Sequence, residues 1–198
     1  VGSEMCIRDR IRSLREQLDR LTALVRTLLE MSNLQSVSRT DQIALAPLVE
    51  EILTDLTPLA QKNNISLQQD CEELGMVGSD ALIYRLVFNL VENGIKYNRP
   101  GGAVRVTLQQ EKQTAVLRVA DTGPGIPADC RESIFQPFFR VDKSRSREMG
   151  GVGLGLALVR EIAVLHGGSV TVERSSENGT TFACLLYTSP SPRDRQKS

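Results

Sequence analysis

Hydrophobic residues recur at three- and four-residue steps over Ile11–Leu34 and predict one long amphipathic helix there. At about 1.5 Å per residue this helix is roughly 36 Å long, too long to bury its apolar side against one compact domain. We therefore expect a partner helix, as in a helical hairpin or a generic coiled-coil arm. The apolar positions are Ile11, Leu14, Leu18, Leu21, Val25, Leu28, Leu29 and Leu34.

The rest of the chain alternates between strand and helix patterns. Residues 36–42 are polar, lack a pattern and are typical of a linker. Pro47 suits the first turn of the helix that follows, and Pro58 is expected to kink that helix. Strands are predicted at 43–45, 65–69, 76–77, 103–108, 114–120, 169–173 and 180–183, and helices at 47–62, 79–98 and 155–165. These elements indicate an α+β sandwich, with a layer of strands covered on one face by helices.

The stretch Asp121–Gly155 has glycines at both ends and basic residues between them. Asp121 ends a predicted strand, and Gly123 and Gly125 can take positive φ and bring the backbone close to a ligand. A buried carboxylate at this position can accept a hydrogen bond from an exocyclic amine, such as that of adenine. Taken alone, the motif is more often a turn that ends a strand.

The other end of this stretch, Gly150–Gly155, leads directly into the apolar periodicity of a helix. Free backbone N–H groups at a helix start attract phosphate. Four cations between the two glycine motifs could fold over a polyphosphate: Arg140, Lys143, Arg145 and Arg147. Taken alone, these glycines would equally suit a flexible hinge.

A third element lies upstream, in the predicted helix that begins near Ser79. Asn89 and Asn93 are spaced i, i+4 on one face, and Lys96 lies one turn further on. Apolar neighbours, among them Leu90, indicate that this face is at least partly buried. Two amide oxygens and an ammonium group on one face suit magnesium with its phosphates, whereas the alternative is a solvated helix end.

These motifs, in this order and spacing, resemble the N, G1, F and G2 boxes of bacterial sensor histidine kinases, which are members of the Bergerat-fold ATPases: NLVENGIKYN, DTGPG, FQPFF and GGVGLGL. The resemblance covers about Ile11–Ala183. It implies a two-layer α+β catalytic domain with a mixed sheet at 43–183, preceded at 11–35 by the second helix of a dimerisation and phosphotransfer hairpin. It further implies transfer of the γ-phosphoryl group of ATP to a histidine, relay to a response regulator, and a homodimer formed through the hairpin helices.

The resemblance also implies roles for individual residues. Asn93, assisted by Asn89, would bind magnesium, and Lys96 would reach a phosphate. Asp121 would accept from the adenine amine, with the hydroxyl of Thr180 assisting at that end. Further contacts to ATP would come from the glycine motifs and the basic residues of the loop: Gly123, Gly125, Arg140, Lys143, Gly151, Gly153, Leu154 and Gly155. Gly94 stands where the family usually has Ala, which lowers helix propensity by about 1 kcal/mol and touches no ligand group.

His166 is the only histidine of the chain. In the resembled family the phosphorylated histidine lies on the first hairpin helix and is followed by an acidic residue. His166 is instead followed by two glycines at a predicted helix end, where a histidine commonly caps carbonyl groups. We therefore expect the phosphoacceptor, and the helix that carries it, upstream of this sequence.

Three other functions are open to a chain with these motifs. A hydrolytic relative of the topoisomerase, mismatch-repair or chaperone type would carry Glu where Asn89 stands, because a base must activate water. An anti-sigma serine kinase would not need the helix at 11–34 or the basic loop. A scaffold with a degenerate nucleotide pocket is disfavoured because the box residues are in place.

Composition narrows the classes of protein further. The 198 residues have zero formal net charge, which argues against a nucleic-acid surface. No apolar run approaches the roughly 20 residues of a membrane span. The four cysteines show no metal or redox spacing and indicate reduced thiols. We expect a cytoplasmic location, with any membrane anchor in segments outside this chain.

Both ends of the chain have an unusual relation at the DNA level. Val1–Asp9 can be encoded by a nucleotide sequence whose opposite strand encodes Cys184–Pro192. This resembles a sequencing adapter flanking a genomic insert. We therefore expect residues 1–10 and 184–198 to be non-native, and the last strand to be cut short after Ala183; resequencing the source locus tests this origin.

Overall fold

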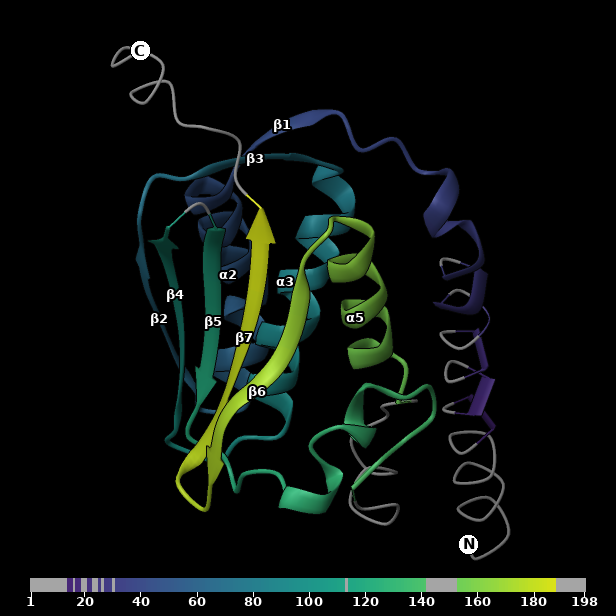
Figure 1. Ribbon diagram of the computed structural model, residues 1–198. Helices are drawn as coiled ribbons and strands as arrows, with labels where there is room; N and C mark the ends of the chain where they lie inside the picture. Colours follow the sequence, from purple (N-terminus) through teal and green to yellow (C-terminus); the bar gives the residue numbers. More distant parts are fainter. Residues whose placement is uncertain are drawn as a thin grey trace, which may run out of the picture.

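The computed structural model describes residues 14–15, 17–18, 21–22, 25, 27–29, 31–112, 114–141 and 153–187. After an N-terminal helix, which ends near Asn33, the larger elements alternate between strands and helices (Figure 1). The strands are β1 (Asp41–Ala44), β2 (Ser66–Cys71), β3 (Gly75–Gly78), β4 (Ala103–Glu111), β5 (Thr114–Asp121), β6 (Ser169–Ser176) and β7 (Gly179–Tyr187). The helices are α2 (Leu45–Lys62), α3 (Asp80–Lys96) and α5 (Gly155–Leu165), and short 3-10 turns lie at Leu34–Ser36, Ala128–Cys130 and Ser133–Phe135.

Five strands form one mixed sheet in the order β2-β4-β5-β7-β6. β2 and β4 run parallel, whereas the other neighbouring strands are antiparallel. The side chains of β4 alternate as a half-buried strand requires, with Val104 and Val106 fully buried and Arg105 exposed. In the same register, Val104 lies opposite Asp121, so this acidic side chain belongs to the buried face of the sheet.

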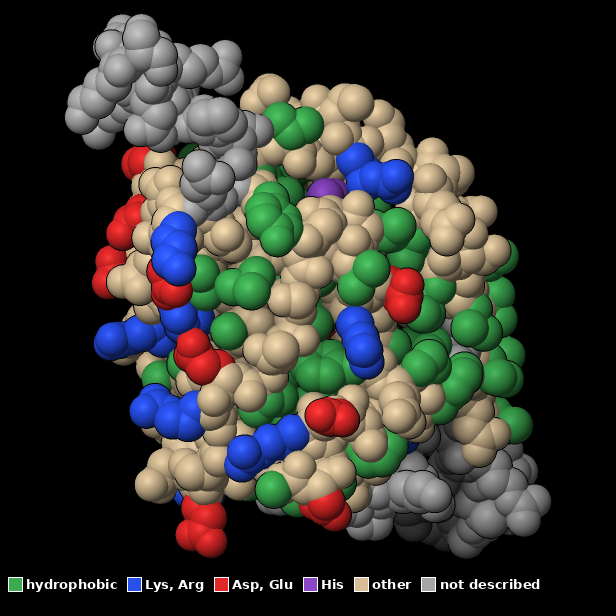
Figure 2. Space-filling model, in the orientation of Figure 1, with side chains coloured by type: hydrophobic (Ala, Val, Ile, Leu, Met, Phe, Trp, Pro, Cys, Tyr) green, Lys and Arg blue, Asp and Glu red, His purple; other side chains and the backbone are tan. Residues whose placement is uncertain are grey.

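Helices α2, α3 and α5 cover that one face of the sheet (Figure 1). Their apolar sides meet it in a single core, where Ile83, Leu86 and Ile162 are completely buried. On the opposite face, Arg118 Nε donates to both carboxylate oxygens of Glu173, at 2.9 and 3.1 Å, and Figure 2 shows charged side chains along this side of the molecule. The predicted α+β sandwich is therefore confirmed.

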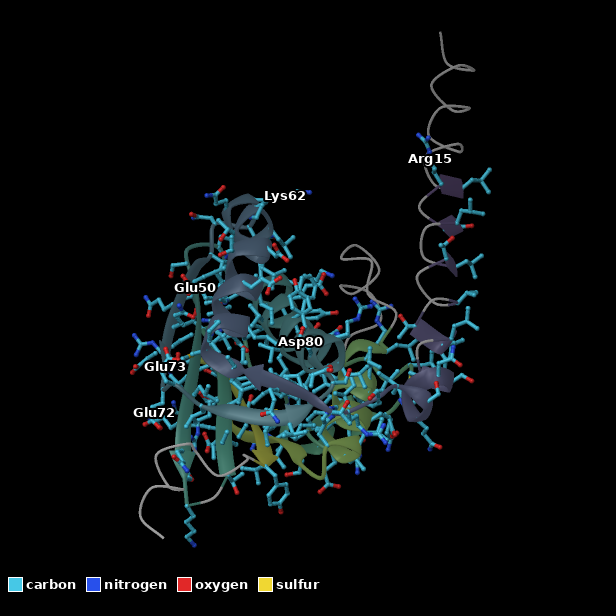
Figure 3. The ribbon with its side chains drawn as sticks, turned by 90° about the horizontal axis from the view of Figure 1, so that it is seen from above. Arg15, Glu50, Lys62, Glu72, Glu73 and Asp80 are labelled. Carbon is cyan, nitrogen blue, oxygen red and sulfur yellow. The ribbon has the colours of Figure 1, made fainter. Side chains whose placement is uncertain are left out.

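A small two-stranded sheet pairs β1 with β3 and closes one end of the domain. Asp41 Oδ2 accepts a hydrogen bond from the backbone N–H of Asp80 at 3.0 Å, which ties this sheet to the first turn of α3. Figure 3 looks down on the small sheet, with Asp80 beside it and Lys62 at the far end of α2. In this view Arg15, on the N-terminal helix, lies apart from both helices.

The N-terminal helix leaves its apolar side uncovered. Leu14, Leu18 and Leu21 are 65%, 65% and 58% exposed, and hydrophobic side chains line this edge of the molecule in Figure 2. Leu34, at the end of the helix, is 4% exposed and joins the core of the domain. The predicted amphipathic stripe is thus present, except that Ile11 lies outside the described residues.

Most element bounds lie close to the predicted ranges, and β1 is an exception. Helix α2 runs to Lys62, with Pro47 in its first turn and Pro58 inside it, as predicted. β1 already begins at Asp41, inside the stretch predicted as a linker, because Gln42 and Ile43 pair with β3. None of the helices that the structure describes has both the length and the hydrophobicity that a bilayer-crossing segment needs.

The last strand corrects a further expectation. β7 was expected to stop after Ala183, but it continues to Tyr187. Cys184 and Leu186 are fully buried on the helix side of the sheet, and Leu185 lies opposite Val116 of β5. Apolar residues that alternate in the strand register complete the sheet whatever their origin. The DNA-level origin of the two ends stays a prediction.

Candidate functional site

The amide side chains of α3 face the start of α5. Asn89 Nδ2 donates to the backbone carbonyl of Arg85 at 2.7 Å, so its Oδ1 is left for another partner. A methyl group in place of a Gly155 hydrogen would lie 3.0 Å from Asn89 Oδ1 and 3.9 Å from Asn93 Nδ2. Both amides are half-buried. The structure therefore brings together three of the predicted site residues, from the N and G2 motifs.

The first turn of α5 has no side-chain cap. Its N-cap residue, Leu154, is buried and supplies no side-chain cap, and the first acidic residue comes well after the first turn. Leu158 N–H donates to the carbonyl of Leu154 at 2.9 Å, and this is the first backbone hydrogen bond at this helix start among the described residues. The N–H groups of the first turn therefore have no partner in the described part of the chain, and such groups attract anions.

Lys96 lies one turn beyond Asn93, as predicted from the spacing. Its Nζ is 2.7 Å from Glu92 Oε1, and the two side chains are 31% and 27% exposed. An exposed i, i+4 pair of this kind contributes only about 0.3–0.5 kcal/mol. The ammonium group can therefore exchange this partner for a more strongly charged one at small cost.

Asp121 is held at the end of β5 by two backbone donors. Its Oδ1 accepts from Gly123 N–H at 2.8 Å and from Thr180 N–H at 3.2 Å. Its Oδ2 has no hydrogen-bond partner among the residues that the structure describes. Burial raises the pKa of this carboxyl above its usual value, and the two backbone hydrogen bonds counteract this only in part. The carboxyl is thus rigid, half-buried and has one acceptor oxygen to spare.

Helix α3 and the loop after Asp121 lie against each other. A methyl group at Gly94 would be 3.1 Å from Val104 and 3.6 Å from Asp121 Cβ, so this glycine lets the helix lie close to the sheet. At the end of the helix, Thr122 Oγ1 donates to Asn98 Oδ1 at 3.0 Å. The sequence suggested only a loss of helix propensity at Gly94, and the structure adds a packing reason for the small residue.

Two glycines of the site require a backbone that other residues rarely adopt. Gly125 has φ +80°, and a methyl group on it would lie 2.1 Å from the carbonyl oxygen of Ser176. Gly153 has φ +78°, and its carbonyl accepts from Phe138 N–H at 2.8 Å. Gly125 lets the loop after Asp121 pack against the end of β6. Gly153 lets the residues just before α5 hydrogen-bond to the FQPFF motif.

The glycine at 125 is therefore expected to be needed for stability. Gly125→Ala should lower the free energy of unfolding by about 2–3 kcal/mol, because it combines a strained φ with an overpacked contact. Gly101→Ala is the matched control: Gly101 has the same φ of +80° but nothing within 4 Å of the added methyl group. Urea unfolding of both variants measures the difference, and equal losses would contradict the steric part of this account.

Arg140 carries an unusual guanidinium group. Its Nε and Nη2 atoms are buried and have no hydrogen-bond partner in the described ranges. Buried polar atoms are nearly always paired, so an unpaired guanidinium indicates that an anionic partner belongs there. Phe139, the residue before it, lies against Gly153. Lys143 and Gly151, together with Arg145 and Arg147, lie outside the described residues.

His166 lies at the opposite end of α5 from these groups. Its Nδ1 is 2.8 Å from the carbonyl of Ile162, and its Nε2 accepts from Ser79 N–H at 3.1 Å. The ring thus caps the end of α5 and joins it to the start of α3, as the sequence predicted for a capping histidine. Neither nitrogen is free to receive a phosphoryl group without breaking one of these bonds.

His166→Ala is expected to destabilise the domain without changing nucleotide binding. It leaves the N–H of the buried residue Ser79 without its acceptor, which should cost about 1–3 kcal/mol. The measurement is urea unfolding alongside a nucleotide titration. A large loss of nucleotide affinity in a variant that remains folded would contradict the assignment of a purely structural role.

Sequence reasoning missed some polar residues beside Asp121. Ser175 Oγ accepts from Ile126 N–H at 2.7 Å and lies 3.0 Å from Thr180 Oγ1. Arg131 Nη2 donates to the Ser175 carbonyl at 2.8 Å. A serine before a hairpin turn and an arginine in a loop are common features. Only the fold, which brings β6 next to this loop, makes them neighbours of the site.

Comparison with known proteins shows the family of this chain. Residues 78–189 match the family described as histidine kinase-, DNA gyrase B- and HSP90-like ATPases. The sensor histidine kinase RppB of Synechocystis is 39% identical in a 172-residue alignment that covers 84% of this chain and 38% of RppB. The chain therefore spans about two fifths of the length of that relative.

Solved structures share the fold. The mycobacterial sensor histidine kinase MprB superposes with a TM-score of 0.68 and 27% identity, over 77% of this chain and 99% of that one. Histidine kinase ThkA, in its complex with the response regulator TrrA, gives a TM-score of 0.73 and 26% identity, over 91% of this chain and 51% of that one. The chain belongs to the histidine kinase-, DNA gyrase B- and HSP90-like ATPases, and contains the ATP-binding catalytic domain of a bacterial sensor histidine kinase.

Proposed function

We propose that this domain binds Mg-ATP between α3, α5 and the loop after Asp121, and transfers the γ-phosphoryl group to a histidine on a helical hairpin. The observation that carries the proposal is the set of unpaired polar groups around this region. The Oδ1 atom of Asn89 faces the start of α5, Asp121 has a spare carboxylate oxygen, and the buried Arg140 guanidinium lacks a partner among the described residues.

The chemistry of these groups fits the two ends of a nucleotide. Asn93 and Asn89 would hold magnesium through their amide oxygens, and magnesium would neutralise charge on the phosphates. The N–H groups at the start of α5, with Gly153, Leu154 and Gly155, would bind phosphate oxygens. Lys96, Arg140 and Lys143 would pair with the outer phosphates. At the other end Asp121 would accept from the adenine amine, supported by Thr180, Gly123 and Gly125.

The amide at position 89 favours transfer over hydrolysis. An amide cannot take a proton from water, whereas a carboxylate at this place could act as a general base. Phosphoryl transfer needs mainly positioning and charge neutralisation, which the cations and backbone N–H groups supply. The acceptor must therefore bring its own nucleophile into line with the phosphoryl group.

The partners follow from the same reaction. His166 is engaged at both ring nitrogens, so the acceptor would be a histidine on a hairpin helix that pairs with residues 14–33. The exposed leucines of the N-terminal helix would form the homodimer interface. ThkA, a structural relative, is found in complex with a response regulator, and a response regulator is the proposed next acceptor for this protein.

Transfer in trans tests this function. The chain is incubated with labelled ATP, magnesium and a separate histidine-bearing hairpin from a sensor histidine kinase. We expect acid-labile label on the hairpin, and none when its histidine is replaced by alanine. The Asn93→Ala chain is the second control. Release of inorganic phosphate without labelled hairpin would instead support a hydrolytic enzyme.

A further inference from the structure

We propose that Ser175 and Arg131 are positioning residues for adenine recognition, which hold Asp121 and the loop after it against the end of β6. The inference rests on the proposed nucleotide site and extends it to two residues that do not themselves face the ligand. They act through Thr180 and through the backbone of Ile126.

Arg131 binds two backbone carbonyls that are far apart in the sequence. Its Nη2 donates to the Ser175 carbonyl at 2.8 Å, and its Nε donates to the Ile126 carbonyl at 3.5 Å. The side chain is half-buried, and no carboxylate partner for it occurs among the described residues. The planar guanidinium fork suits two acceptors at once. Arg131 therefore fastens the loop after Gly125 to β6.

Ser175 continues this connection toward the carboxylate. Its Oγ accepts from Ile126 N–H at 2.7 Å and shares a hydrogen bond with Thr180 Oγ1 at 3.0 Å. Thr180 is 4% exposed, and its N–H donates to Asp121 Oδ1 at 3.2 Å. A shift of Ser175 would thus move both the loop and the residue that orients Asp121.

A β-bulge places Ser175 in this position. Val172 lies opposite Phe182 on the helix side of the sheet, and simple alternation would put Arg174 on that side next. The register shifts between Val172 and Arg174, so that Ser175 instead lies opposite Thr180. Bulges re-aim side chains beside functional sites, and here the effect is to replace a long cation by a small hydroxyl.

Matched variants separate positioning from folding. Ser175→Ala removes the hydroxyl, whereas Ser175→Thr keeps it. Arg131→Gln removes the guanidinium group that donates to two carbonyls at once, whereas Arg131→Lys keeps one donor group. Arg174→Gln is the control, because this exposed neighbour has its side chain on the other face of the strand.

The readout is the ratio of affinities for ADP and inosine diphosphate, which has a carbonyl in place of the adenine amine. Both are titrated with magnesium into the full 198-residue chain, with the melting temperature measured in parallel. Losing one or two hydrogen bonds that orient the acceptor should weaken ADP about five- to tenfold and inosine diphosphate much less.

The inference is supported if Ser175→Ala and Arg131→Gln lower this ratio, Ser175→Thr restores it and Arg174→Gln leaves it unchanged. An unchanged ratio in the two loss variants, with or without a lower melting temperature, would overturn the inference while the nucleotide site stands. Failure of the unaltered chain to bind ADP would overturn the proposed function and this inference with it.

Discussion

Asn93→Ala is expected to abolish magnesium-dependent nucleotide binding. Asn93 is half-buried on the face of α3 that meets Gly155, and alanine has no oxygen to offer a metal. Loss of a residue that merely orients a metal ligand already lowers metal affinity about 10–100-fold, so loss of the ligand itself should exceed this. The measurement is calorimetric titration with an ATP analogue at fixed magnesium concentration.

The control for this variant is Asn63→Ala. Asn63 is an exposed amide at the end of α2, where its Nδ2 donates to the Leu59 carbonyl at 2.8 Å rather than to α5 or to the loop after Asp121. It should leave nucleotide affinity unchanged. Near-normal affinity of the Asn93→Ala chain, at unchanged magnesium dependence, would remove Asn93 from the site.

Asp121→Asn is expected to reverse the preference for adenine over guanine. In the native chain Oδ1 accepts from Gly123 and Thr180, and Oδ2 is left for the ligand. An asparagine would keep its oxygen toward the two backbone donors and turn its NH₂ group toward the base. The NH₂ group cannot accept a hydrogen bond from the adenine amine, because both groups are donors, but it can donate to the guanine carbonyl. ATP affinity should fall about 10–100-fold, since a hydrogen bond to a charged group is lost.

The same variant should stabilise the nucleotide-free protein. The pKa of Asp121 is raised by burial, so the folded state binds its proton more tightly than the unfolded state does. The favourable contribution of the protonated Asp121 carboxyl to folding stability is present below the pKa of the unfolded state. It is lost as the pH rises through the pKa of the folded state. At neutral pH a neutral asparagine avoids the penalty of a buried charge. A higher melting temperature together with weaker ATP binding is the expected pair of results.

The native chain should also lose ATP affinity on acidification. Protonation of Asp121 removes the negative acceptor, and the raised pKa moves this loss to a higher pH than an ordinary aspartate would give. The Asp121→Asn chain should not show this pH-dependent loss of ATP affinity. Unchanged selectivity between ATP and GTP in Asp121→Asn would exclude Asp121 as the residue that distinguishes the bases.

The sequence alone predicted the parts of this fold that have strong local patterns. The helices α3 and α5 follow from apolar periodicity, and the strands β4 and β5 from alternation around a turn. The proposed site residues Asn89, Asn93 and Asp121 were selected because motifs in a fixed order carry information that single residues do not. These features are local in sequence, so a pattern can reveal them.

The remaining features depend on long-range pairing. The extension of β7 to Tyr187 depends on its neighbours β5 and β6, which no local pattern reports. The roles of Arg131 and Ser175 need a bulge and a neighbouring loop from 44 residues away. The start of β1 at Asp41 likewise depends on its pairing with β3.

The most direct test of the central claim is calorimetric titration of the chain with a non-hydrolysable ATP analogue, with and without magnesium. A nucleotide site built from Asn89, Asn93, Asp121 and the start of α5 predicts binding that is strong with magnesium and much weaker without it. No binding in a chain whose cooperative unfolding shows that it is folded would contradict the account, and would support a scaffold without nucleotide chemistry.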